Sequence, residues 1–196
     1  MQKIDEGLPG ARYLKLVQAV ERGETSDYVF FWGREPGDTS EVGPFVFSQW
    51  YLSDFVVAGV TYPTAEHCMM FNKAALMGDE ATKRAILMDA KEGKSPSVAK
   101  QYGRLVKNWD QAAWDVHKFG IVVDTSVAKF GQNAALRGYL LSTGDRALVE
   151  ASPYDKVWGI GMKRDNPRAR DPRKWDGENL LGFALMEARD RLRAES

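Results

Sequence analysis

The apolar residues of this chain change their spacing near Thr64, and this change gives the clearest structural signal in the sequence. Before it, residues 28–33 and 45–59 carry the aromatic and β-branched side chains typical of short strands, the second range with a turn inside it. From Thr64 the apolar period lengthens to about 3.6 residues, which predicts an amphipathic helix. Thr64 suits the N-cap of this helix, and Gly78 suits its end.

Downstream of this helix, capping residues and apolar faces mark more helices than strands. The expected helices cover residues 79–90, 95–106, 110–144 as two consecutive stretches, and 177–195. A strand over 146–152 and a glycine-rich turn over 154–162 lie between the last two ranges. These elements predict an α+β fold, a compact and mostly helical single domain with a few short strands. They lack the regular βαβ alternation of a doubly wound sheet.

The first 26 residues stand apart from the rest because they carry no motif. Residues 10–22 have a helical pattern of apolar positions. We therefore expect residues 1–26 to form a helical N-terminal extension and residues 27–196 to form the functional domain.

Composition places the chain among ordinary globular proteins, with 44% hydrophobic and 28% charged residues. No apolar run approaches the roughly 18 residues that a membrane span needs, and the N-terminus does not resemble a signal peptide. Cys68 is the single cysteine, so an internal disulfide cannot form. These features favour a cytoplasmic protein without a membrane partner.

The charges balance, with 27 basic and 27 acidic residues. A net charge of zero argues against a general nucleic-acid coat protein, which is usually basic. The exception is the loop Lys163–Lys174, where six cations face two aspartates. Two interpretations of this loop stay open: a solvated surface loop, or a lip that attracts a phosphate-bearing substrate.

Glu66 and Lys73 fall on one stripe of the helix that begins after Thr64. At 100° per residue the two side chains lie about 20° apart around the helix and about 10 Å apart along it, with Met70 between them. They are either an ion pair at the edge of the core or two ends of a small site. In a site, burial would raise the pKa of the carboxyl and lower that of the ammonium, which suits acid–base and nucleophilic chemistry.

Other positions offer chemistry, each with a structural alternative. Asp155 and Trp158 lie three residues apart, and Gly159 allows a ligand to approach the backbone, so this turn is either a platform for a base or a surface turn with a packed tryptophan. Arg104 is either a phosphate clamp or an ordinary surface arginine. Asn179 is either a helix N-cap or a ligand contact.

The two histidines do not indicate a metal site. His67 points about 100° away from Glu66 on the same helix, and we expect a hydrogen-bonded structural role for it. His117 has no neighbouring pattern of cysteine or carboxylate ligands. No metal and no other cofactor is implied by the sequence.

Seven short motifs occur in order along the chain, and together they resemble the NADAR family, the YbiA-like N-glycosidases linked to NAD and ADP-ribose metabolism. The motifs are "YLSDF", "YPTAEHCMMFNKA", "AKQYGR", a later tryptophan, "KFGQNAALRGYLLSTGD", "LVEASPYDKVWGIG" and "DGENLLGFALMEAR". The resemblance covers about residues 28–192, and an ordered set of motifs is far more specific than any one of them.

The resemblance implies a compact, largely helical fold and hydrolysis of N-glycosidic bonds. The family's catalytic glutamate and lysine correspond to Glu66 and Lys73. The aspartate and tryptophan of its "D-x-x-W-G" motif correspond to Asp155 and Trp158, and its tryptophan after "GR" corresponds to Trp109.

The chain departs from the family pattern at two positions. Asp54 stands where the family usually has asparagine, and Cys68 stands where it usually has an aromatic residue. Asp54 would add negative charge near the site, which bears on substrate preference more than on reaction type. The expected substrate-binding residues are Trp158, Trp109, Arg104, Gly159, Asn179 and Asp54.

Residues and resemblance together predict an N-glycoside hydrolase. Glu66 and Asp155 would divide charge stabilisation at C1′ and proton donation, while Lys73 would bind phosphate or trap the opened ribose as a Schiff base. The expected substrate is either ADP-ribosylated guanine, in nucleic acid, or a phosphorylated ribosylamino-pyrimidine of riboflavin synthesis. The alternative is a non-catalytic ADP-ribose-binding module, which would bind its ligand without releasing a base.

Overall fold

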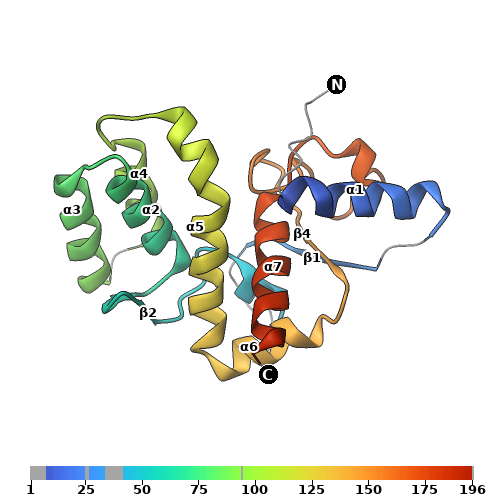
Figure 1. The fold of residues 1–196 in the computed structure, drawn as a ribbon, viewed down its shortest axis with the longest axis horizontal. Helices are drawn as coiled ribbons and strands as arrows, with labels where there is room; N and C mark the ends of the chain where they lie inside the picture. The colour runs from blue at the N-terminus through green and yellow to red at the C-terminus, as the bar shows by residue number, and fades with distance from the viewer. Residues whose placement is uncertain (1–7, 25–26, 34–41, 94, 196) are drawn as a thin grey trace.

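Figure 1 shows the computed structural model of the chain, which describes residues 8–24, 27–33, 42–93 and 95–195. The α-helices are α1 (Leu8–Glu21), α2 (Ala65–Leu76), α3 (Glu80–Lys91), α4 (Pro96–Arg104), α5 (Gln111–Gly131), α6 (Ala134–Ser142) and α7 (Leu180–Ala194). The remaining elements are strands β1 (Tyr28–Phe31), β2 (Phe55–Val57), β3 (Val60–Tyr62) and β4 (Ala147–Glu150), with 3-10 helices η1 (Pro44–Phe47) and η2 (Pro172–Lys174). The predicted α+β fold, mostly helical with a few short strands, is confirmed.

Helix α5 stands between two parts of the fold (Figure 1). On one side, α2, α3 and α4 pack on one another and α2 packs on α5. On the other side, α7 packs on α5 and on β4. Residues 180–186 of α7 are all buried, so this helix forms much of the core between its neighbours. The arrangement brings the start of α2 and the end of β4 toward a common region, although they are far apart in sequence.

The strands of the described chain form two separate pairs. β1 and β4 run parallel, with Phe31 opposite Glu150 at their carboxyl ends. β2 and β3 form an antiparallel hairpin that turns at Ala58, with φ 50°, and Gly59, with φ 79°. In parallel α/β sheets, ligands bind beyond the carboxyl ends of the strands, so the edge marked by Glu150 is the one to inspect for a site.

The first of the two strands expected within 45–59 is wrong, because Pro44–Phe47 form the 3-10 helix η1. The ammonium of Lys129, 1% exposed, donates to the carbonyl oxygens of Val46 at 2.7 Å and Ser48 at 2.9 Å. These bonds satisfy backbone groups that a strand partner would otherwise satisfy. The aromatic and β-branched composition of this segment therefore reflects burial in the core.

The expected starts of α2 and α4 agree with the structure because they depend on local contacts. Thr64 caps α2, and its hydroxyl accepts a hydrogen bond from the His67 N–H. Gly78, with φ 66°, follows the end of α2 in the left-handed conformation that glycine tolerates. Ser95 caps α4, with Pro96 at its first position. No helix within the described ranges is both long and apolar enough to cross a membrane.

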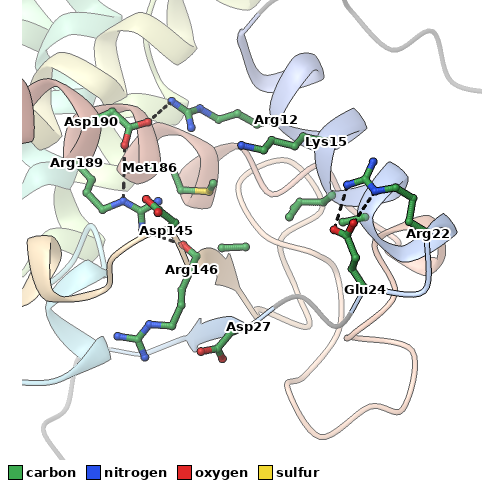
Figure 2. A pocket seen from close by; sticks show the side chains of 13 residues that line it. Arg12, Lys15, Arg22, Glu24, Asp27, Asp145, Arg146, Met186, Arg189 and Asp190 are labelled. Atoms are coloured by element: carbon green, nitrogen blue, oxygen red, sulfur yellow. Dashed lines mark hydrogen bonds and ion pairs between the residues drawn. The ribbon is translucent and has the colours of Figure 1, made fainter.

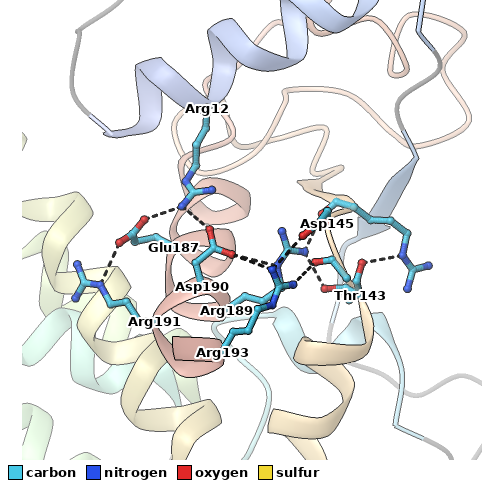
Figure 3. A network of polar contacts seen from close by, with 10 residues as sticks. Arg12, Thr143, Asp145, Glu187, Arg189, Asp190, Arg191 and Arg193 are labelled. Atoms are coloured by element: carbon cyan, nitrogen blue, oxygen red, sulfur yellow. Dashed lines mark hydrogen bonds and ion pairs between the residues drawn. The ribbon is translucent and has the colours of Figure 1, made fainter. Parts of the chain in front are cut away.

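Helix α1, from the expected N-terminal extension, docks on α7. The Arg12 guanidinium donates to the carboxylates of Glu187 at 2.6 Å and Asp190 at 3.0 Å (Figure 3), and Leu16 reaches the main core. A cavity of about 480 Å³ lies beside α1, with side chains of α1, α7 and the start of β4 around it (Figure 2). Residues 1–7 and 25–26 of the extension lie outside the described ranges.

Candidate active site

The first turn of α2 fixes Glu66 in the protein interior. Its backbone N–H donates to the Gln49 carbonyl oxygen at 2.9 Å, which ties the helix to the segment before β2. Thr64, the N-cap two residues before Glu66, fixes the start of the helix. Glu66 is 4% exposed. A carboxyl group is therefore held by a fixed backbone at a place that water scarcely reaches.

The surroundings of Glu66 make its carboxyl group protonatable near neutral pH. Burial raises its pKa to about 7 against the opposing charge of Lys100 and a hydrogen bond from the Trp50 side chain; Asp155 adds to the rise and Lys73 opposes it. The Oε1 atom is buried and has no hydrogen-bond partner among the described residues. Leaving such an atom unpaired is costly, and a perturbed, unpaired carboxyl indicates a group that meets a proton or a ligand.

Lys73 lies at the other end of the same helix face, as the sequence predicted. Its Nζ is 4.3 Å from the centroid of the Trp109 ring and 5.6 Å from that of Trp114. Burial lowers the pKa of the Lys73 ammonium, and the charge of Arg104 lowers it further, while Glu66 opposes the shift. The ion pairs of the described chain do not include Glu66 with Lys73, so the ion pair that was one of the two interpretations is not formed, and a shared site stays a prediction.

The turn after β4 presents Asp155. Its Oδ1 accepts hydrogen bonds from the backbone N–H groups of Val157 at 2.9 Å and Trp158 at 2.8 Å. These donors fix the direction of the Asp155 side chain. Asp155 also acts electrostatically on Glu66, which places the turn and the first turn of α2 at one site.

Trp158 and Gly159 mainly contact other parts of the protein. The half-buried Trp158 packs against the main core. A Cβ atom at Gly159 would lie 2.8 Å from the Glu150 carbonyl oxygen and 3.1 Å from that of Asp155. Glycine is thus required at this position because backbone carbonyl oxygens of the protein itself, and not a ligand, come close to its Cα atom.

Asn179 lies at the N-cap position of α7 with φ 56°, but its side chain does not cap the helix. Its Nδ2 donates to the Leu148 carbonyl oxygen at 3.0 Å, and its Oδ1 accepts from the Glu150 N–H at 2.9 Å. Asn179 is 0% exposed, which leaves no side-chain surface for a ligand. The residue therefore holds the end of β4 in place.

The other expected substrate-binding residues lie on the surface. Arg104 is exposed at the end of α4 and close enough to act on the charge of Lys73. Trp109 is 41% exposed beneath the Lys73 ammonium. Asp54 is exposed just before β2, and its backbone oxygen accepts a hydrogen bond from Asn133. Arg104, Trp109 and Lys73 lie near one another and combine cationic and aromatic side chains. The role of Asp54 in substrate preference stays a prediction.

The structure adds residues that sequence reasoning missed, namely Trp50, Lys100 and Glu150. Trp50 binds the Glu66 carboxyl group, and the Lys100 Nζ lies 5.8 Å from the centroid of the Trp50 ring. Burial, helped by the charge of Asp155, raises the pKa of the Glu150 carboxyl to about 8. Each of the three residues lies within one of the seven motifs or directly beside one. Their location in or beside a motif was the one signal in the sequence that could have identified them.

An exposed aromatic pair flanks the carboxyl ends of β1 and β4. Trp32 directly follows β1 and is 51% exposed, and Tyr154 directly precedes Asp155 and is 84% exposed. Their ring centroids are 6.1 Å apart. Large aromatic surfaces exposed beside buried carboxyl groups offer a place for a planar ligand to stack.

His67 has the structural role that was expected. Its ring lies 2.7 Å from the Thr64 hydroxyl oxygen through Nδ1 and 3.1 Å from the Asp89 carboxylate through Nε2. His67 and Asp89 are both 0% exposed, and they join α2 to α3. The cavity beside α1 is also separate from the site, because none of Glu66, Lys73 and Asp155 lines it.

The known proteins that are similar to this chain include two N-glycosidases and a riboflavin biosynthesis protein. N-glycosidase R617 of Acanthamoeba polyphaga mimivirus is 40% identical over 172 residues, which cover 85% of this chain and 97% of that protein. N-glycosidase YbiA of Escherichia coli K12 is 33% identical over 154 residues, covering 76% and 80%. The riboflavin biosynthesis protein PYRR of Zea mays is 32% identical over 136 residues, covering 67% of this chain and 20% of that protein.

The fold has a known counterpart as well. The NMR structure of E. coli YbiA matches with a TM-score of 0.68 at 29% sequence identity, covering 87% of this chain and 88% of that one. Residues 30–193 match the NADAR domain, a stretch that contains every residue of the site described above and excludes α1. The chain therefore belongs to the NADAR family.

Proposed function

We propose that the chain hydrolyses the C1′–N bond of a ribosyl or ADP-ribosyl substrate whose leaving group is a nucleobase or a related heterocycle. The observation that carries the proposal is the carboxyl group of Glu66, which is buried, has a pKa of about 7 and keeps Oε1 without a partner among the described residues. The names of the mimivirus and E. coli relatives support the reaction class.

The chemistry needs two kinds of group. Positive charge develops at C1′ as the bond to nitrogen breaks, and a fixed carboxylate stabilises it. Asp155 suits this role because two backbone N–H groups fix the direction of its carboxylate. Proton transfer needs a group that changes its charge near neutral pH, and Glu66 has that property.

Lys73 serves the sugar-phosphate part of the substrate. Its ammonium stands over Trp109, and the exposed guanidinium of Arg104 lies close enough to lower its pKa. Two cations that repel one another gain from an anion placed between them, which favours a phosphorylated substrate. The lowered pKa of Lys73 also supports addition of its amine to the aldehyde of an opened ribose, with loss of water.

A planar leaving group finds exposed aromatic surface next to these charges. Trp109 lies at the Lys73 end, and the Trp32–Tyr154 pair lies at the Asp155 end. The half-buried ring of Trp158 supports the core and is the weaker candidate for stacking.

The small phosphorylated metabolite is the better supported of the two substrate classes. In the basic loop Lys163–Lys174, Arg168 pairs with Asp176, and both Arg173 and Lys174 pair with Asp171. These pairs reduce the field that would attract a nucleic-acid backbone. The similarity to the maize riboflavin biosynthesis protein also favours the phosphorylated pyrimidine intermediate over ADP-ribosylated guanine.

The test is direct detection of the released base. The purified chain is incubated with a phosphorylated ribosylamino-pyrimidine and, separately, with ADP-ribosylated guanine, and the products are separated by chromatography. The proposal expects free base from at least one of them, in amounts that grow with time. Binding of ADP-ribose with no base released from either would instead identify a non-catalytic binding module.

A further inference from the structure

Glu150 is a buried carboxyl group that the proposed reaction has not yet used. It is the last residue of β4, opposite Phe31 of β1. Its N–H donates to the side chain of Asn179 at 2.9 Å, and its carbonyl oxygen accepts from the N–H of Ile160 at 2.9 Å. A backbone fixed on both sides gives the side chain a defined direction, which is what a group acting on a substrate needs.

The side chain of Glu150 is only partly satisfied. The residue as a whole is partly exposed, yet Oε2 is buried and has no hydrogen-bond partner among the described residues. Glu66 has an oxygen in the same condition. A buried carboxyl oxygen without a donor is a costly feature unless it carries a proton or meets a ligand.

Electrostatic repulsion among neighbouring carboxylates decides which carboxyl group holds a proton. Glu150 feels the negative charges of Asp155 and Glu66, and Lys100 is the ammonium that opposes their effect on it. Three carboxylates so placed do not all ionise together, because each negative charge disfavours the next. Burial raises the pKa values of Glu66 and Glu150 to about 7 and about 8, and the Oδ1 of Asp155 is engaged by two backbone N–H donors. Glu150 therefore holds a carboxyl group that is protonated near neutral pH.

We propose that Glu150 is a catalytic residue, the acid whose hydroxyl proton passes to the nitrogen of the departing base. As the C1′–N bond breaks, its electron pair stays on that nitrogen and takes the proton from Glu150. Water then bonds to C1′, and the proton it loses passes to the Glu66 carboxylate. The sum is substrate plus water giving free base plus ribose, and proton exchange between the two carboxyl groups restores both.

This inference rests on the proposed function and changes one part of it. The family resemblance pointed to Glu66 and Asp155 as the two carboxyl groups of the reaction. The Oδ1 of Asp155 is already engaged by two backbone N–H donors, whereas Glu150 keeps Oε2 without a partner among the described residues. In this mechanism Asp155 stabilises the positive charge at C1′, and Glu150, at the end of β4, donates the proton.

The test compares the wild type with Glu150→Gln, Glu150→Asp and the control Glu178→Gln, which alters an exposed glutamate of the following loop. Turnover is followed between about pH 6 and about pH 10 on the substrate from which the wild type releases base. Wild-type turnover should fall on the alkaline side as Glu150 loses its proton. Glu150→Gln should lose at least about a hundredfold in kcat and lose the alkaline fall, whereas Glu150→Asp should keep that fall at a lower rate.

Two outcomes would overturn the inference. One is a wild-type rate that stays flat above neutral pH, which needs no variant and is unaffected if Glu150→Gln fails to fold. The other is a folded Glu150→Gln protein with the turnover and pH profile of Glu178→Gln.

A separate readout distinguishes failure of this inference from failure of the proposed function. The difference between the infrared spectra of the free wild type and of free Glu150→Gln should contain a protonated carboxyl band at neutral pH, and the same difference band should persist when both proteins also carry Glu66→Gln. If the wild type releases no base, the proposed function fails while this band still decides whether Glu150 is protonated. If base is released and the band is absent, the proposed function stands and Glu150 is not the acid.

Discussion

The side chain of Trp50 donates a hydrogen bond to the carboxyl group of Glu66, and this contact joins the segment before β2 to the first turn of α2. The bond favours the ionised form of Glu66 against the effect of burial. Lys100, whose ammonium lies 5.8 Å from the same indole ring, acts in the same direction. The pKa of about 7 is thus a balance that single substitutions should move.

Replacing Trp50 by phenylalanine should raise the pKa of Glu66. The substitution removes the donor and keeps most of the aromatic bulk, so the charged form loses the free energy of a charge-assisted hydrogen bond. A shift of about one pH unit is expected from that bond. The measurement is the pH dependence of kcat/KM, whose acidic limb should move to higher pH.

The matched control for this variant is Trp175→Phe. The Trp175 Nε1 donates to the Ala169 carbonyl oxygen at 2.8 Å, away from Glu66. An acidic limb at the same pH in Trp50→Phe, Trp175→Phe and the wild type would show that the bond does not tune Glu66.

Replacing Glu66 by glutamine should stabilise the fold increasingly as pH rises. The folded pKa of about 7 is raised above the ordinary value of 4.5, so the stability present below about pH 4.5 is lost as pH rises through about 7. The amide does not titrate and escapes this loss. The gain in free energy of unfolding over the wild type should grow across that window, up to about 3 kcal/mol.

Urea unfolding at about pH 5 and about pH 8 measures this effect. The exposed Glu178→Gln variant should show no such pH-dependent gain. Equal stability differences at the two pH values for Glu66→Gln would mean that Glu66 ionises as freely in the folded chain as in the unfolded one.

Asn179→Gly should weaken both stability and turnover. Glycine accepts the φ of 56° at this position, so the substitution removes the side-chain amide without backbone strain. The Leu148 carbonyl oxygen and the Glu150 N–H would lose their partner, at a cost of about 2–4 kcal/mol in the free energy of unfolding. A loss below about 0.5 kcal/mol would contradict the role of Asn179 as the support of β4.

Arg12→Ala should lower stability while leaving catalysis intact. The ion pairs of Arg12 with Glu187 and Asp190 are partly buried, and their loss should reduce the free energy of unfolding by about 1 kcal/mol. Helix α1 contributes no group to the site, so kcat and KM of the folded variant should match those of the wild type. A lower kcat at full folding would show that the N-terminal extension takes part in the chemistry.

Local features of the sequence predicted local features of the site. The Thr64 cap and the shared face of Glu66 and Lys73 follow from helix geometry over a few residues, and the structure agrees with both. The sequence predicts a strand from Phe45 because burial and strand pairing favour the same side chains, and only the core contacts distinguish that strand from the 3-10 helix Pro44–Phe47.

The convergence of distant segments was beyond sequence reasoning. Trp50, Lys100 and Glu150 come from three elements, and nothing in the spacing of residues shows that they meet at Glu66. The buried amide of Asn179 shows the same limit, because a residue that suits a helix cap turned out to bind the backbone of a strand. The partners of a polar side chain are set by packing between elements.

The central claim is that Glu66 takes part in cleavage of the C1′–N bond, and turnover by folded Glu66→Gln tests it most directly. The substrate is whichever compound the wild type cleaves, and folding of the variant is checked by its urea unfolding transition. The amide keeps the shape of the side chain and removes its ability to exchange a proton, so kcat should fall at least about a hundredfold. A rate close to that of the wild type would contradict the claim and leave Glu66 as a buried carboxyl group without a catalytic role.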